Sequence, residues 1–346
     1  MWRRSTATGA LLALCAASPA AAQIDAHVVA TTSDNAQGNC DAIDVDPPWT
    51  VAPNLEPVGI RSRVRYFDDL IYVVNPATDD IQVIDPVSFD TVRTLRMGRD
   101  TSPEDILVVS PSRAYVSLYD STTLAIIDPG NGAPRGSVDL SGFADADGLP
   151  EMSMMARDGG RLFVQIQRLD RMSSNPVPPS WLAVIDLDTE SLVDLDPGTP
   201  GPQGIPLIGA VPSFRMHVDV RERRLFVSTP GPRLNTSGGI EEIDLETLQS
   251  LGFILSEAEV SADVGGFVMT SVDSGYALSH TDIVASSHHF PFDRSTGQGG
   301  EVLLTYGFIE TLAVDPGTEQ LFFPDPFSVP HGEHVGDAAT GRLLTR

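Results

Sequence analysis

The sequence predicts an all-β protein, a seven-bladed β-propeller, from two repeated elements and from the lack of helical patterning. An apolar residue followed by Asp and a turn recurs seven times, at intervals between 41 residues (Ile43 to Ile84) and 58 residues (Ile127 to Ile185). An aromatic or β-branched run, typical of a strand, precedes each of these pairs. No apolar stripe of period 3.6 follows the first 22 residues. Units of this length, each with four short strands, are typical of propeller blades.

The repeated elements follow one another in the same order through the chain. The runs expected to form second strands are Val28–Thr31, Tyr72–Asn75, Tyr115–Ser117, Phe163–Gln165, Phe226–Ser228, Tyr276–Leu278 and Phe322–Phe323. The pairs expected to end third strands are Ile43-Asp44, Ile84-Asp85, Ile127-Asp128, Ile185-Asp186, Ile243-Asp244, Phe292-Asp293 and the degenerate Gly336-Asp337. A first strand ending in a tight turn precedes most units, and a β-branched run closes each. Because one small sheet cannot bury both faces, we expect the blades to stack around a ring as a single domain, residues 23–346.

Closure of the ring is open at the level of the sequence. The N-terminal unit, from about Ala26 to Leu55, offers second to fourth strands but no obvious first strand, and the chain stops at Arg346 with no strand left to donate. Either closure is unusual, or Gln23–Asp25 contributes, or the ring has six full blades plus an N-terminal partial blade. We expect seven blades.

Residues 1–22 are typical of a secretory signal peptide. Arg3 and Arg4 form a basic start, Thr8–Ala17 is apolar but too short to span a bilayer, and Ala20–Ala22 offers a small-residue cleavage site. A lipid-anchored form through Cys15 is the alternative, although Leu14 fits a lipoprotein box poorly. The sequence therefore predicts an exported protein, periplasmic or extracellular, without membrane insertion.

The charge balance excludes polyanionic partners. The chain has 47 acidic residues against 22 basic ones, every one of them Arg, and a formal net charge of -25. Nucleic acid and anionic membranes both need a cationic surface, so neither is expected as a partner. We expect a monomer that binds a small molecule or an envelope protein.

The wording of the repeats resembles the YVTN-type propellers, named for a Tyr-Val-Thr-Asn second strand. Tyr72–Asn75, the Ser102–Ile106 lead-in and the Ile127–Pro129 turn carry that resemblance. Phe143–Met152 and Gln167–Arg171 look like a subgroup of exported bacterial propellers with no activity attached. The resemblance implies the fold, whereas related families include lactonase-like hydrolases, lyases of cyclic peptides and cobalamin-capturing surface proteins. Fold does not choose among these functions.

Binding is expected on one face of the ring, here called the long-loop face. Loops from second to third strands, and from fourth strands to the next first strand, leave a blade on the same side, and functional residues concentrate on such loops. The long loops expected there are Ser141–Ser153, Arg168–Ser180, Asp196–Ser213, Pro230–Gly239, His280–Ser287 and Pro324–His334.

Three groups of residues could carry chemistry on this face. The first is a zinc or copper candidate made of His280, His288, His289, His331 and His334; its alternative is separate loop histidines that bond the rim. The second is a calcium candidate, Asp145, Asp147 and Glu151, which falls short of an EF-hand pattern and could be a solvated acidic turn. The third is an anion-binding candidate formed by Arg168, Asp170, Arg171, Arg215 and His217, although these arginines could instead pair with loop acids.

The sequence favours a binding module over an enzyme, because it contains no nucleophile elbow, P-loop, dinucleotide fingerprint or redox Cys pair. The module would capture a small molecule, a metal complex or a partner protein on the long-loop face. The alternatives are a metal-assisted hydrolase or lyase of the lactonase-like type, with calcium or zinc as the candidate cofactor, and a structural envelope protein without ligand.

Overall fold

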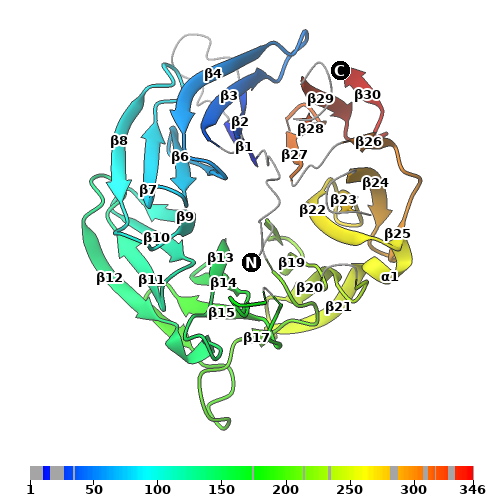
Figure 1. Cartoon of the computed structure of the whole chain (residues 1–346). Coiled ribbons are helices and arrows are strands. Elements are labelled where there is room, and N and C mark those ends of the chain that lie inside the picture. The colour runs from blue at the N-terminus through cyan, green and yellow to red at the C-terminus, as the bar shows by residue number, and fades with distance from the viewer. Residues whose placement is uncertain are drawn as a thin grey trace.

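Seven antiparallel sheets stand around a common centre in the computed structural model, which confirms the predicted seven-bladed propeller (Figure 1). The structure describes residues 11–15, 27–33, 36–173, 175–212, 215–232, 235–280, 287–306, 311–315, 317–325 and 332–345. Each blade has its first strand near the centre and its fourth strand on the outer rim. The alternative of six blades and a partial one is therefore wrong.

The strands follow the order that the repeats predict. Blade one contains β1 (Leu11–Cys15), β2 (His27–Ser33), β3 (Gly38–Asp44) and β4 (Val51–Val58). Blade two contains β5 (Arg63–Phe67), β6 (Leu70–Asn75), β7 (Asp80–Ile84) and β8 (Thr91–Arg96). Blade three contains β9 (Pro103–Ser110), β10 (Arg113–Leu118), β11 (Thr123–Ile127) and β12 (Pro134–Asp139), followed by a single 3-10 turn at Ser141–Phe143.

Blades four to six carry small additions to the four-stranded plan. Blade four contains β13 (Met152–Asp158), β14 (Arg161–Ile166), β15 (Trp181–Asp186) and β16 (Ser191–Val193), with β17 (Ile205–Pro206) also paired to β15. Blade five contains β18 (Met216–Asp219), β19 (Arg224–Thr229), β20 (Gly239–Asp244) and β21 (Gln249–Ser256), and the short helix α1 (Glu257–Val260) follows it. Blade six contains β22 (Asp263–Met269), β23 (Ser274–His280), β24 (Ser287–Asp293) and β25 (Gln298–Gly299), with β26 (Leu304–Tyr306) also paired to β24. Blade seven contains β27 (Ala313–Asp315), β28 (Gln320–Asp325), β29 (Gly332–Asp337) and β30 (Leu343–Thr345).

The repeated Asp of the sequence has a structural role in the turn between third and fourth strands. The Asp186 carboxylate accepts hydrogen bonds from the backbone N–H of Asp188 (3.0 Å) and Thr189 (2.8 Å). The Asp244 carboxylate does the same for Glu246 (2.8 Å) and Thr247 (2.9 Å). A carboxylate that caps a turn in this way replaces the backbone acceptors that the turn lacks. The Asp repeat therefore marks blade architecture and does not mark a site.

The hydrophobic core is divided among the contacts between neighbouring blades. Separate buried clusters join blades one and two, two to four, four and five, five and six, six and seven, and seven and one. Arginines reinforce several of these contacts, as in the hydrogen bond from Arg93 to the Gly130 carbonyl (3.1 Å) and the ion pair of Arg113 with Glu190 (3.0 Å). The ring is held together as predicted, by each blade covering the next.

The ring closes by side-chain packing between blades one and seven. Val28 and Ile43 of blade one share a buried cluster with Phe322 and Val335 of blade seven. The Trp49 indole N–H also donates to the Gln320 amide oxygen across this contact, at 3.1 Å. No strand of blade seven, as far as the chain is described, pairs into the sheet of blade one.

The first strand that the sequence left unassigned is Leu11–Cys15. It pairs in register with β2, from Leu11 opposite Thr31 to Cys15 opposite His27. The C-terminal strand β30 pairs within blade seven, and Gln23–Asp25 lie outside the described residues. Leu11–Cys15 lies inside the segment predicted to be a signal peptide. The pairing with β2 is observed in the structure, whereas the signal peptide stays a prediction.

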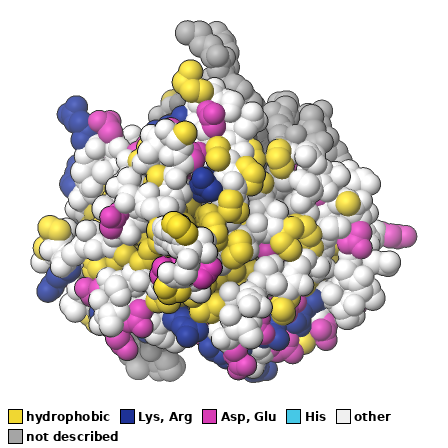
Figure 2. Space-filling model, turned by 90° about the horizontal axis from the view of Figure 1, so that it is seen from below, with side chains coloured by type: hydrophobic (Ala, Val, Ile, Leu, Met, Phe, Trp, Pro, Cys, Tyr) yellow, Lys and Arg dark blue, Asp and Glu magenta, His cyan; other side chains and the backbone are white. Residues whose placement is uncertain are grey.

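The outer rim is less uniformly acidic than the composition suggests. Apolar side chains gather in the middle of the rim seen in Figure 2, with basic and acidic side chains scattered around them. Ile208, next to β17, and Leu251, in β21, are 57% and 56% exposed, and these two strands contact each other. This part of the rim therefore exposes apolar side chains among charges of both signs.

Candidate functional site

The innermost strands of successive blades bring a polar cluster together near the axis of the ring. β5, β9, β13 and β18 are the first strands of blades two to five, and neighbouring members of this series contact each other. First strands start at the long-loop face, so residues at their beginnings lie at that end of the axis. Arg65, Asp105 and Met155 lie within three of these strands, and Arg215 directly precedes the fourth.

Arg65 and Asp105 form an ion pair that also makes hydrogen bonds to blade four. The Arg65 Nε donates to Asp105 Oδ1 at 2.7 Å, and its Nη2 donates to Asp105 Oδ2 at 2.5 Å. The same Nη2 donates to the Met155 carbonyl (2.9 Å), while the Met155 N–H donates to Asp105 Oδ2 (2.7 Å). The Asp105 side chain is fully buried and that of Arg65 is 25% exposed. Both carboxylate oxygens are thus occupied, and three blades are joined at one point.

Arg215 lies beside this pair but does not take part in it. Its side chain is exposed to solvent, and it makes no hydrogen bond or ion pair with any part of the chain that the structure describes. The surrounding protein and the positive charge of Arg65 lower the pKa of Arg215 to about 10, against the opposing charge of Asp105. The guanidinium is therefore charged, reached by water, and not neutralised by an acid of its own.

His217 completes what we call the axis site, defined as Arg65, Asp105, Arg215 and His217. His217 lies two residues beyond Arg215 in β18 and is partly buried, with its ring centroid 6.2 Å from that of Phe226. Burial, and then the charge of Arg215, lower the pKa of His217, while Asp219 acts in the opposite direction. The imidazole is therefore neutral at pH 7 and senses the charge state around Arg215.

The other members of the predicted anion site are occupied by protein groups. Arg168 donates to the Pro179 carbonyl at 3.1 Å. Asp170 accepts the N–H groups of Met172 (2.7 Å) and Ser173 (3.0 Å), which lowers its pKa. Arg171 forms an ion pair with Asp120 of blade three. The structure therefore separates this predicted group, with Arg215 and His217 near the axis and the Arg168–Arg171 segment tying its own loop in place.

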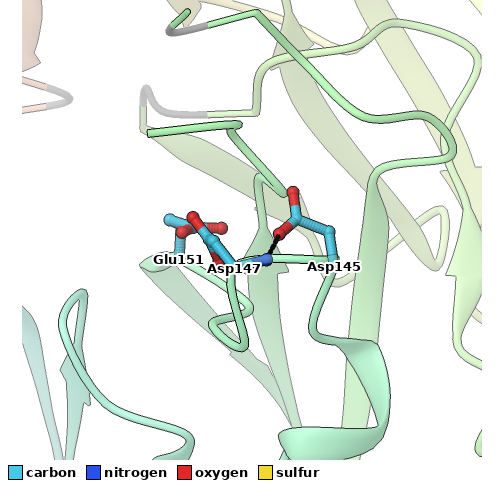
Figure 3. Close-up of side chains that lie close together, drawn as sticks. All are labelled: Asp145, Asp147 and Glu151. Atoms are coloured by element: carbon cyan, nitrogen blue, oxygen red, sulfur yellow. Dashed lines mark hydrogen bonds between the residues drawn. The ribbon is translucent and has the colours of Figure 1, made fainter. Parts of the chain in front are cut away.

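The predicted calcium ligands do come together. One carboxylate oxygen from each of Asp145, Asp147 and Glu151 lies within 4.8 Å of the others (Figure 3). Asp145 accepts the Asp147 N–H at 3.0 Å, and the fully buried Glu151 accepts the Leu169 N–H at 3.1 Å. Asp145 Oδ2 and Glu151 Oε1 are buried without a hydrogen bond. Burial raises the pKa of Glu151 to about 7.

Arg171 supplies a positive charge to this acidic cluster. Its Nε lies 3.7 Å from Asp147 Oδ2 and 3.6 Å from Glu151 Oε1, and its guanidinium carbon lies 5.6 Å from the Tyr119 ring centroid. The three carboxylates have the hard oxygen donors that calcium prefers. A tethered guanidinium already lies among them, however, so the arrangement favours internal pairing over a bound ion.

The histidines of blades six and seven are distributed over different surroundings. His280 bonds Ser287 (3.0 Å) and His288 bonds Thr305 (3.0 Å), each through Nδ1. His289 is fully buried between the rings of Tyr276 and Phe323, both 5.0 Å away, and burial lowers its pKa to about 4.

His334 packs against Phe323, the same ring that His289 contacts, with ring centroids 5.5 Å apart. His331 lies outside the described residues. Over the described part of the chain, the acidic cluster is the one group of three or more potential metal ligands, and no histidine belongs to it. The predicted shared zinc or copper site therefore gains no support from these side chains.

Sequence reasoning missed Arg65 and Asp105, the pair that builds the axis site. A signal was present, because Arg63 and Arg65 alternate along a strand in a lysine-free chain, and Glu104 and Asp105 open an otherwise apolar first strand. Such charges at the start of two adjacent first strands indicate pairing near the axis.

Comparisons with known proteins agree on the fold. No family model matches the chain, and no curated protein matches it, so the resemblance to YVTN-type propellers stays a prediction. Among solved structures, the β-propeller domain of Cps50 (Swd1) from Myceliophteria thermophila aligns with a TM-score of 0.61 at 10% identity, over 85% of this chain and 88% of that one. A candidate 6-phosphogluconolactonase from Bacteroides fragilis aligns with a TM-score of 0.59 at 14% identity, over 93% and 90%. The dihydro-heme d1 dehydrogenase NirN aligns with a TM-score of 0.52 at 15% identity, over 92% of this chain but only 63% of NirN.

Fold and site together define the class: a seven-bladed propeller with a polar site near its axis. Its structural neighbours carry different names, from a dehydrogenase to a β-propeller domain of Cps50 (Swd1), and identities this low show the fold alone. No helix in the described part of the chain is long and apolar enough to cross a membrane.

Proposed function

We propose that the protein is an exported binding module that captures a small molecule at the long-loop end of the ring axis. The observation that carries this proposal is Arg215, a solvent-reached guanidinium surrounded by protein and left without an acidic partner in the described structure. An arginine that the described fold does not use keeps its donors available for an anionic ligand. Export follows from the signal-like residues 1–22.

A binding role is favoured over a metal-assisted hydrolase by the placement of the histidines. His288 and His289 are consecutive residues of β24 and so lie on opposite faces of its sheet. His289 is fixed between two aromatic rings, in an apolar contact between blades six and seven. Among the described residues, no group of three or more potential metal ligands includes a histidine, which supports a binding role over the metal-assisted enzyme.

The proposal is tested by native mass spectrometry of protein purified from the cells that make it. We expect an additional mass of a few hundred daltons or less on the wild-type protein, and its loss in Arg215→Gln. The matched control is Arg221→Gln. Arg221 is an exposed arginine of the same blade, but it lies in the β18–β19 turn on the opposite face. A retained mass that both variants keep would place binding elsewhere and overturn the proposal.

A further inference from the structure

We infer that Arg215 recognises an acidic group of the ligand, a carboxylate or a phosphate, in the axis site. This inference rests on the proposed binding function and adds the chemical class of ligand. It follows from the balance of charge near the axis, from the fixed geometry of Asp105, and from the response expected of His217.

The charges on the first strands of blades two and three are already matched. Arg63 pairs with Glu104, and Arg65 pairs with Asp105, so each of these arginines has an acid of its own. Arg215 adds a third positive charge without a third acid among the described neighbours. The site therefore carries one uncompensated positive charge inside a protein whose formal net charge is -25.

Asp105 cannot turn to neutralise Arg215 without breaking other contacts. Its Oδ1 accepts from Arg65 Nε, and its Oδ2 accepts from both Arg65 Nη2 and the Met155 N–H. Rotation of this buried carboxylate would leave a buried backbone N–H and part of the Arg65 fork unpaired. A negative charge that pairs with Arg215 must therefore come from outside the Arg65–Asp105 pair.

A guanidinium suits a planar acidic group better than other ligands. Its donors form a rigid fork that binds a carboxylate or a phosphate through two parallel hydrogen bonds. Because the whole protein is strongly acidic, a compact anion with one or two charges is favoured over a polyanion. His217 lies two residues beyond Arg215, and the positive charge of Arg215 contributes to lowering the pKa of its imidazole.

The experiment is an NMR titration of the His217 ring in the full-length protein, with acetate, inorganic phosphate and neutral acetamide as probes at constant ionic strength. An anion beside Arg215 offsets the positive charge that depresses the pKa of His217, so acetate or phosphate should raise this pKa in a saturable manner. Acetamide should leave it unchanged. Arg215→Gln should itself raise the pKa of His217 and weaken anion binding about tenfold to a hundredfold. Arg221→Gln should behave as wild type.

The outcomes distinguish a phosphate ligand from a carboxylate ligand. They also distinguish failure of this inference from failure of the proposed binding function. Arg215→Lys should retain phosphate better than acetate, because an ammonium is an adequate point charge for phosphate but lacks the fork that matches a carboxylate. If neither anion gives a saturable response, or the response survives in Arg215→Gln, the inference is wrong. If native mass spectrometry finds a neutral compound that depends on Arg215, the inference fails while the proposed binding function stands.

Discussion

Removing the Asp105 carboxylate is expected to destabilise the ring more than removing any exposed acid. In Asp105→Asn the side chain keeps its shape, but Arg65 loses its counter-charge and the Met155 N–H competes for the one remaining acceptor oxygen. Breaking a buried ion pair from one side costs about 3–5 kcal/mol. Because the Arg65 side chain is 25% exposed, water recovers part of that cost, and we expect about 2–4 kcal/mol.

The assay is urea unfolding, followed by far-UV circular dichroism and by tryptophan fluorescence, because a chain of this size need not unfold in two states. The control is Asp120→Asn, which removes the partner of Arg171. That pair is 40% and 30% exposed, so the expected loss is below about 1 kcal/mol. A double variant, Arg65→Gln with Asp105→Asn, should be more stable than the sum of the single losses predicts. If Asp105→Asn stays within about 0.5 kcal/mol of wild type, the pair does not join the three blades energetically.

Three further predictions concern the acidic cluster and the repeated turns. The wild-type protein should lose stability as pH rises from about 4.5 to 7, because burial raises the folded-state pKa of Glu151 to about 7 and the folded state binds the extra proton in that window. Glu151→Gln should abolish this loss. Parallel pH profiles of the two proteins would contradict the prediction. Arg171→Gln should make the melting temperature rise with millimolar calcium relative to chelator, because the tethered charge beside Asp147 and Glu151 is then gone; an equal response in wild type would mean that Arg171 does not stand in for an ion. Asp186→Ala should lower the melting temperature by removing the acceptor for Asp188 and Thr189, and the difference from wild type should shrink below the depressed pKa of Asp186; a loss that persists unchanged at low pH would point to a cause other than the carboxylate.

The blade pattern was predictable because it is local. The second-strand run and the turn-capping Asp each depend on residues a few positions apart, as in the hydrogen bonds that the N–H groups of Glu246 and Thr247 donate to the Asp244 carboxylate. The Asp-capped turn recurs in blades two to seven, so the sequence repeats it visibly. Seven blades and their strand order follow from counting, except for the first strand of blade one, Leu11–Cys15, which the repeats did not identify.

The axis site was predictable only in part because it depends on contacts between distant residues. Arg65 and Asp105 are 40 residues apart, and Arg65 and Met155 are 90 apart. Neighbouring first strands are brought together by the ring, and one sequence does not reveal which of their side chains point at each other. Arg168, Arg171 and Arg215 therefore looked equivalent in the sequence, whereas the structure pairs two of them and leaves the third.

That difference among arginines is the strongest guide to function in this chain. Arg93 and Arg113 contact groups of the neighbouring blade, and Arg171 ties a long loop to blade three. In a lysine-free protein, arginine is thus the ordinary means of joining blades, and a structural reading would assign Arg215 the same task. Arg215 does not join blades within the described structure, because Asp105, the acid beside it, already pairs with Arg65. An arginine near the ring axis that is open to water and unused by the described fold keeps its donors available for a ligand that carries negative charge.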